Sequence, residues 1–116
     1  MLTISPNTFD AFSSVEEQKF NARLAEFLRE EVPGFAQLPQ ETLLKQVSAV
    51  VSSAREFGME SEEAVACYAL TAAHLGPDFP DKFPGARQIL DAPISDDEKA
   101  EHLEAYSVSL FEALAV

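Results

Sequence analysis

The sequence is poor in basic residues. It has 8 Lys and Arg against 20 Asp and Glu in 116 residues, which gives a formal net charge of −12 at pH 7. A strongly acidic surface repels nucleic-acid phosphates and anionic membranes. We therefore expect no direct binding to nucleic acid or to a membrane surface. The same charge favours solubility and a basic protein partner.

Cysteine and long apolar runs are also scarce. The single cysteine, Cys67, has no second cysteine to pair with inside the chain, which is consistent with a reducing compartment. No apolar run approaches the roughly 20 residues that a membrane-spanning helix needs. Residues 1–6 lack the basic and apolar regions of a secretory signal. We therefore expect a soluble, cytoplasmic protein.

The motifs of catalysis and of cofactor binding are missing too. There is no Gly-rich phosphate loop, no Ser or Cys nucleophile motif and no Cys/His metal spacing. Cys67 and His74 are seven residues apart, about 10.5 Å along a helix, which is too far for a nucleophile–base pair. The sequence therefore favours a non-enzymatic protein with no cofactor.

A metal site at Glu98, Glu101 and His102 is one alternative. Glu98 and His102 are four residues apart, a spacing that helical metal sites use. No second segment offers matching Glu or His ligands, so an exposed Glu–His pair is the favoured interpretation. A metal-dependent enzyme remains a minor hypothesis.

Apolar residues recur at helical intervals along most of the chain. They predict an all-α fold, a single domain over residues 1–116, built as a bundle of about five helices. Capping residues, prolines and glycines give the expected limits: Ser5-Pro6 to Val32-Pro33-Gly34, Pro39 to Gly58, Glu60 or Ser61 to Gly76-Pro77, 84–91, and Ser95 onwards.

Two local features add detail to this helical pattern. The first helix has apolar positions at Phe9, Phe12, Phe20, Leu24, Phe27 and Leu28. A capping box at 14–17 predicts a break near Ser13-Ser14. The third helix carries alanines at 64, 66, 69, 72 and 73, which predict close approach to another helix.

Residues 76–84 form a Pro/Phe-rich loop between the third and fourth helices. Three prolines stiffen it, since each fixes its own φ angle. Phe79 and Phe83 are expected to plug the ends of the helical core. They are also the favoured apolar contacts for a protein partner.

Most acidic clusters lie at predicted helix starts, where the helix dipole favours negative charge. This explains the clusters at 16–17, 60–63 and 96–98 without any function. Glu30 and Glu31 do not fit, because they lie at a helix C-terminus, with only Arg29 as partial compensation. They are therefore candidate partner-binding residues.

The last helix has a predicted buried stripe at Leu103, Tyr106, Leu110, Ala113 and Leu114. Val108 and Phe111 lie off this stripe. They could form a dimer contact or line a shallow groove filled by the first helix, and the second interpretation is favoured. Phe111 is retained as a candidate contact, and the oligomeric state stays open.

Four segments in order carry a family resemblance: residues 2–5 (Leu-Thr-Ile-Ser), 54–58 (Ala-Arg-Glu-Phe-Gly), 75–79 (Leu-Gly-Pro-Asp-Phe) and 84–90 (Pro-Gly-Ala-Arg-Gln-Ile-Leu). The chain resembles, over most of its length, a group of small uncharacterised all-helical bacterial proteins encoded beside effector genes of type VI secretion systems. Phe57 stands where that group has Tyr, and Gly85 where it often has Trp.

The resemblance implies an accessory role. Such a protein would act as an adaptor or chaperone that holds a secreted effector, with an apolar groove between helices taking an effector segment. An immunity protein that inhibits a cognate toxin is the alternative. An acidic nucleic-acid mimic is a further, weaker one. The expected partner is thus a protein, a secreted effector or a toxin.

Overall fold

The computed structural model describes the backbone of residues 6–115 and the side chains of residues 15–113. These residues form helices and no strand, so the all-α prediction is confirmed. The elements are α1 (Pro6–Glu31), the 3-10 turn η1 (Pro33–Phe35), α2 (Gln40–Glu56), α3 (Glu62–Leu75), α4 (Phe79–Lys82), α5 (Pro84–Asp91) and α6 (Asp96–Ala115).

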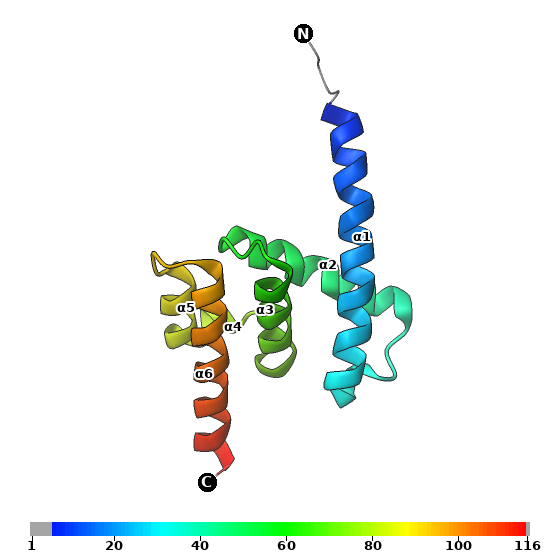
Figure 1. The fold of residues 1–116 in the computed structure, drawn as a ribbon. Helices are drawn as coiled ribbons and strands as arrows, with labels where there is room; N and C mark the ends of the chain where they lie inside the picture. The colour runs from blue at the N-terminus through cyan, green and yellow to red at the C-terminus, as the bar shows by residue number, and fades with distance from the viewer. Residues whose placement is uncertain (1–5, 116) are drawn as a thin grey trace.

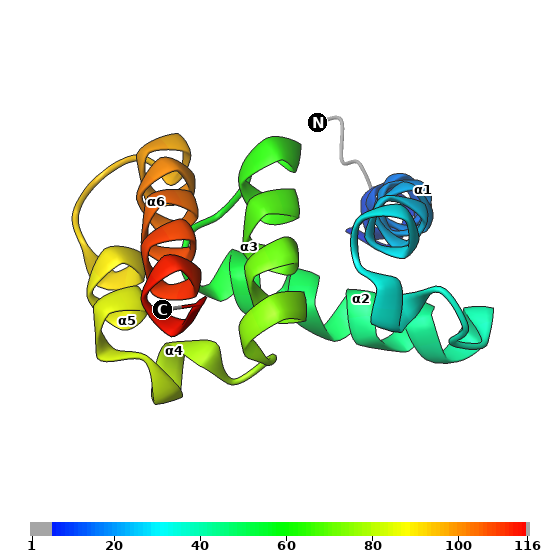
Figure 2. The ribbon, with the colours of Figure 1, turned by 90° about the horizontal axis from the view of Figure 1, so that it is seen from below.

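Helix α3 lies in the middle of the molecule. Helices α1, α3 and α6 run side by side, with α3 between the other two, and α2 crosses α1 and α3 (Figures 1 and 2). Helix α5 packs beside α6, and the short helix α4 packs on α5 and α3 (Figure 2). The N-terminal half of α1 projects beyond the other helices (Figure 1), in a molecule measuring 62 × 38 × 20 Å.

Tyr68, at the centre of α3, organises the core. Its side chain is 1% exposed, and its ring lies 4.9 Å from that of Phe79 and 6.1 Å from that of Phe57. These contacts join α3 to α4 and to the end of α2. The other large, fully buried side chains are Leu43, Met59, Leu90, Leu103, Val47, Val51 and Val65.

The predicted helix ends are largely confirmed. Gly58 follows α2 at φ +83°, and the amides of Gly58 and Met59 bond to the carbonyls of Arg55 and Ala54, a Schellman motif. The hydroxyl of Ser61 accepts a bond from the amide of Ala64 and so begins α3.

The last three predicted boundaries are also close to those observed. Gly76, at φ +105°, ends α3. Helix α5 occupies the predicted residues 84–91. The hydroxyl of Ser95 accepts from the amide of Glu98 at the start of α6. The stiff loop at 76–84 contains one extra helical turn, α4.

The predicted break at Ser13-Ser14 is wrong, because α1 is one helix from Pro6 to Glu31. A serine inside a helix costs only about half a kcal/mol relative to alanine. Interrupting the helix would free several backbone hydrogen bonds, so the local capping signal is overridden. The side chains of Phe9 and Phe12, and the capping residue Ser5, lie outside the described residues.

The prediction that the first helix fills a groove on the last helix is also wrong. Helix α1 packs on α2 and lies on the opposite side of α3 from α6 (Figure 1). Val108 and Phe111 are therefore left 51% and 41% exposed. Of the predicted stripe on this helix, Leu103 is buried, Tyr106 and Leu110 are half-buried and Ala113 is exposed, while the side chain of Leu114 lies outside the described residues.

Helices α5 and α6 approach closely at Gly85. A Cβ atom built on Gly85 would lie 2.5 Å from Cε2 of Tyr106, which is shorter than the 3.0 Å that Cβ contacts in real structures almost always exceed. The ring of Tyr106 therefore occupies the space of any side chain at position 85. The Trp found at this position in the resembling group could not be accommodated without moving that ring.

We expect Gly85→Ala to lower the free energy of unfolding by about 1–3 kcal/mol, because the added methyl group must displace the Tyr106 ring or the helix. Urea denaturation followed by circular dichroism measures the change. Gly34→Ala is the control, since no atom lies within 4 Å of a Cβ there. Equal stability of the two variants would contradict the close packing described.

Burial of Tyr68 predicts a loss of stability in alkali. Removal from water raises the pKa of its phenol to about 12. An exposed tyrosine in the unfolded chain ionises near 10, so above that pH the unfolded state releases a proton that the folded state keeps. The contribution of Tyr68 to the free energy of unfolding, which is fully present below pH ~10, should therefore fall as the pH rises toward 12.

Replacing Tyr68 by Phe should remove this alkaline dependence while preserving the ring contacts. Unfolding by urea at a series of pH values from neutral to strongly alkaline tests it, with Tyr106→Phe as the control. A Tyr68→Phe variant whose stability falls as steeply as that of the parent would show that Tyr68 is not the group responsible.

Candidate functional site: an apolar groove on α2 and α3

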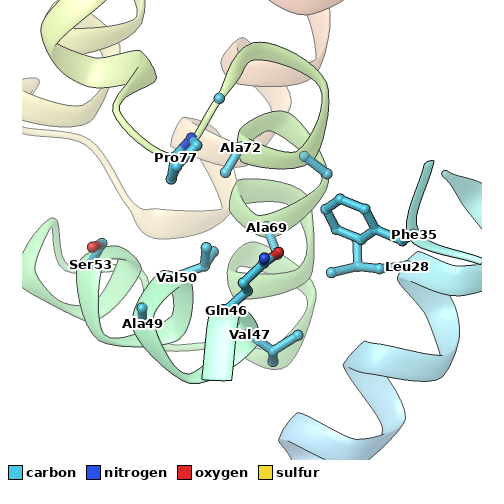
Figure 3. Close-up of a pocket in the computed structure, with 12 residues that line it drawn as sticks. Leu28, Phe35, Gln46, Val47, Ala49, Val50, Ser53, Ala69, Ala72 and Pro77 are labelled. Carbon is cyan, nitrogen blue, oxygen red and sulfur yellow. The ribbon is translucent and has the colours of Figure 1, made fainter. Parts of the chain in front are cut away.

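A groove of about 410 Å³ lies between α2 and α3. The end of α1 and η1 form one wall, and the Gly76-Pro77 turn stands at the other end (Figure 3). No charged residue lines it. The lining residues are Leu28, Phe35, Gln46, Val47, Ala49, Val50, Ser53, Ala69, Ala72, Ala73, Gly76 and Pro77.

Two helical stripes form the main faces of the groove. Gln46, Ala49 and Ser53 follow one another at intervals of three and four along α2. On α3, Ala72 and Ala73 follow Ala69 by three and four positions, and Ala69 and Ala72 present only methyl groups to the groove (Figure 3). Of the alanines expected to approach another helix, Ala69 and Ala72 are 1% and 4% exposed, and Ala73 is half-buried.

Arg29 fixes the wall that carries Phe35. Its guanidinium donates to the carbonyl oxygens of Phe35, Ala36 and Leu38 at 3.2, 3.0 and 2.8 Å, and to Oε1 of Gln40 at 3.0 Å. From the sequence, Arg29 is expected only to compensate part of the negative charge of Glu30 and Glu31. The available signal was an arginine in the last turn of a helix that precedes a short loop, where free carbonyls need donors.

The basic residues of the chain are all engaged within it. Arg29 and Lys99 bind backbone carbonyls, and Lys99 Nζ lies 2.9 Å from the oxygen of Phe57. The other six form ion pairs: Lys19–Glu16, Arg23–Glu62, Lys45–Glu41, Arg55–Glu17, Lys82–Asp78, and Arg87 with Asp81 and Asp91. The surplus of negative charge is left without cations.

Of the acidic pair at the end of α1, only Glu31 is a neighbour of the groove. Glu30 and Glu31 are both exposed, and within the described part of the chain neither has a basic group within 4.0 Å. Glu31 follows the lining residue Leu28 by three positions, so the two are neighbours on the surface of α1, whereas Glu30 is two positions from Leu28 and lies on another side of the helix. One of the five predicted contact residues therefore lies beside this groove.

The three predicted aromatic contacts lie elsewhere. Phe79 is 0% exposed and packs on Tyr68, so it plugs the core as expected and offers no exposed surface to a partner in this structure. Phe83 is half-buried against the core at the start of α5. Phe111 is exposed on α6, where its ring lies 5.6 Å from that of His74. None of the three lines the groove.

The acids at the start of α6 bind groups at the start of α3. Oδ2 of Asp96 accepts bonds from the amides of Glu60 and Ser61 at 3.0 and 2.9 Å, and these bonds lower the pKa of Asp96. Ser61 Oγ also donates to Asp97. These contacts tie the start of α3 to that of α6. The pair 16–17 differs, because it lies inside α1 and not at a helix start.

The remaining candidates are Cys67 as a nucleophile and Glu98, Glu101 and His102 as metal ligands. Cys67 is half-buried, its Sγ lies 3.3 Å from the carbonyl oxygen of Ala100, and desolvation raises the pKa of the thiol, which makes it a poor nucleophile. Glu98 bonds to Ser95, while Glu101 and His102 are exposed. The part of the chain that the structure describes has no group of three or more His, Cys, Asp or Glu placed to hold a metal ion.

Comparison with known proteins adds no relative: no family model, curated protein or solved structure matches the chain. Among the described residues, no helix has both the length and the apolar character required to cross a membrane.

Replacing Arg29 by Met should lower the free energy of unfolding by about 1–3 kcal/mol, because three backbone carbonyls lose a charged donor. Hydrogen exchange should accelerate in η1 and at the start of α2. Arg23→Met is the control, since an exposed ion pair such as Arg23–Glu62 contributes at most about 1 kcal/mol. A smaller effect at Arg29 than at Arg23 would contradict the role assigned to Arg29.

Proposed function

We propose that this protein is a non-enzymatic, protein-binding accessory protein that holds a segment of its partner in the groove. The observation that carries the proposal is an apolar, uncharged groove between α2 and α3 with small side chains on its floor. A segment that presents apolar side chains would bury them there, and burial of apolar surface is the main favourable contribution to such binding.

The nature of the partner follows from the family resemblance. We propose a secreted effector of a bacterial type VI secretion system, with this protein as its adaptor or chaperone in the cytoplasm. An adaptor has to bind without destroying its cargo, and a groove that takes one short segment leaves the rest of the effector untouched. This supports the adaptor role ahead of inhibition.

Inhibition of a cognate toxin is the second candidate function. The observation that favours it is the pair Glu30 and Glu31, which is exposed and has no basic group within 4.0 Å among the residues that the structure describes. Unpaired acids of this kind could face a basic catalytic cleft. A nucleic-acid mimic has less support, because Asp96, Asp97 and Glu98 are engaged at helix starts and form no repeated phosphate-like row.

The test compares two glutamate substitutions on α2 in the full chain. Ala49→Glu adds a charge to an exposed residue that lines the groove, whereas Ser48→Glu adds the same charge to an exposed residue outside the lining, about 100° around the same helix. We expect a secreted effector to co-purify in stoichiometric amount with the parent and with Ser48→Glu, and to be lost with Ala49→Glu. The effector, purified separately, should reproduce the complex.

The effector's own activity then separates the two roles. An effector that stays active and is exported only when this protein is present supports the adaptor. An effector silenced in the complex, together with rescue of cells that express it, would assign the immunity role. Retention of the effector by Ala49→Glu would exclude the groove as the binding site.

A further inference from the structure

We infer that the segment held in the groove is an amphipathic helix of a second protein, with Leu- or Phe-sized side chains on one face and Lys or Arg at its ends. The inference rests on the proposed function and specifies the chemistry of the ligand. Three observations support it: the small side chains of the groove, the charges beside it and the engagement of the chain's own basic residues.

The small lining residues determine the size of the ligand's side chains. Ala49 on α2 and Ala69 and Ala73 on α3 line the groove with methyl groups only, and a space of about 410 Å³ stays between the helices. A ligand has to supply the missing volume, because close packing between surfaces requires large groups opposite small ones. An alanine-rich segment would leave cavities, whereas Leu or Phe would fill the space.

The charge beside the groove determines the ends of the ligand. Glu31 follows the lining residue Leu28 by three positions at one end, and Glu56 follows the lining residue Ser53 by three positions on α2. Within the described residues none of these carboxylates has a basic group within 4.0 Å. Lys or Arg at the ends of an apolar helix would complement them.

A second copy of this chain is a poor occupant for the same reason. Each copy carries a net charge of −12, so pairing two copies brings like charges together. The Lys and Arg residues that could offset this repulsion are already bound to carboxylates or carbonyls of their own chain. A basic segment from another protein meets no such repulsion.

The experiment measures binding of labelled peptides to the full chain by fluorescence anisotropy. Each peptide is a helix of about 18 residues, close to five turns, with Leu on one face and Gln and Ala on the other. One version has two Lys residues at each end, and a second has Glu there. A third has Lys ends and the Leu positions scrambled.

We expect the Lys-ended helix to bind about tenfold tighter than the Glu-ended one at low salt, a difference that shrinks at about 0.5 M salt as the charges are screened. The scrambled peptide should bind at least about tenfold more weakly than its parent, because it has no continuous apolar face. Ala49→Glu should weaken the Lys-ended helix, and Ser48→Glu should leave it unchanged.

Two double variants of equal net charge localise the effect. Glu31→Gln with Glu56→Gln should reduce the preference for Lys ends several-fold. Glu101→Gln with Glu104→Gln removes the same charge from exposed positions on α6 and should leave the preference intact.

Several outcomes would overturn the inference. Equal binding of the Lys-ended and Glu-ended helices would contradict the claim that the ligand has basic ends. Equal binding of the Lys-ended helix and its scrambled version would show that charge attraction alone, and not an apolar face, holds the peptide. A dimer that Ala49→Glu dissociates in sedimentation, with no peptide bound, would assign the groove to a second copy. If the peptides give either of the first two results and the effector is still lost from Ala49→Glu, the proposed function stands and only the ligand chemistry is wrong.

Discussion

Burial of α3 between α2 and α6 is the constraint on which the rest of the structure depends. Helix α3 has a wide buried face, with Tyr68 as its largest member, and contacts α1, α2, α4 and α6. Its burial sets where α4 must place Phe79, and the bonds from Asp96 to the start of α3 set where α6 begins. The groove is the part of this arrangement that no helix of the chain covers.

The basic and the acidic residues differ in how far groups of their own chain engage them. The few basic residues hold helices and loops in place, as Arg29 holds the turn before α2 and Arg55 pairs with Glu17 across α1 and α2. Exposed pairs of this kind contribute little energy each, but together with the carbonyl contacts they engage every Lys and Arg of the chain. Among the described residues, the exposed Glu30 and Glu31 have no basic group within 4.0 Å.

The helices could be predicted from the sequence because their signals are local. Gly58 and Gly76 take positive φ angles, Ser61 and Ser95 cap helices, and Pro84 begins α5 as expected. The local signal failed at Ser13-Ser14, where an equally local capping pattern lost to the continuity of α1. Phe79 shows the other limit: its burial in the core could be expected, but the same apolar ring also suggested a surface contact.

The site depended on contacts that no local pattern encodes. The sequence points to Glu31 because it opposes the helix dipole, but nothing in the sequence places its neighbour Leu28 in one groove with Ala49 and Ala73, residues far along the chain. The sequence by itself determined an acidic, all-helical protein with defined helix ends, since capping and periodicity act over a few residues. Only the tertiary structure decided that α1 packs away from α6 and that an apolar groove stays open, because these follow from packing between segments distant in sequence.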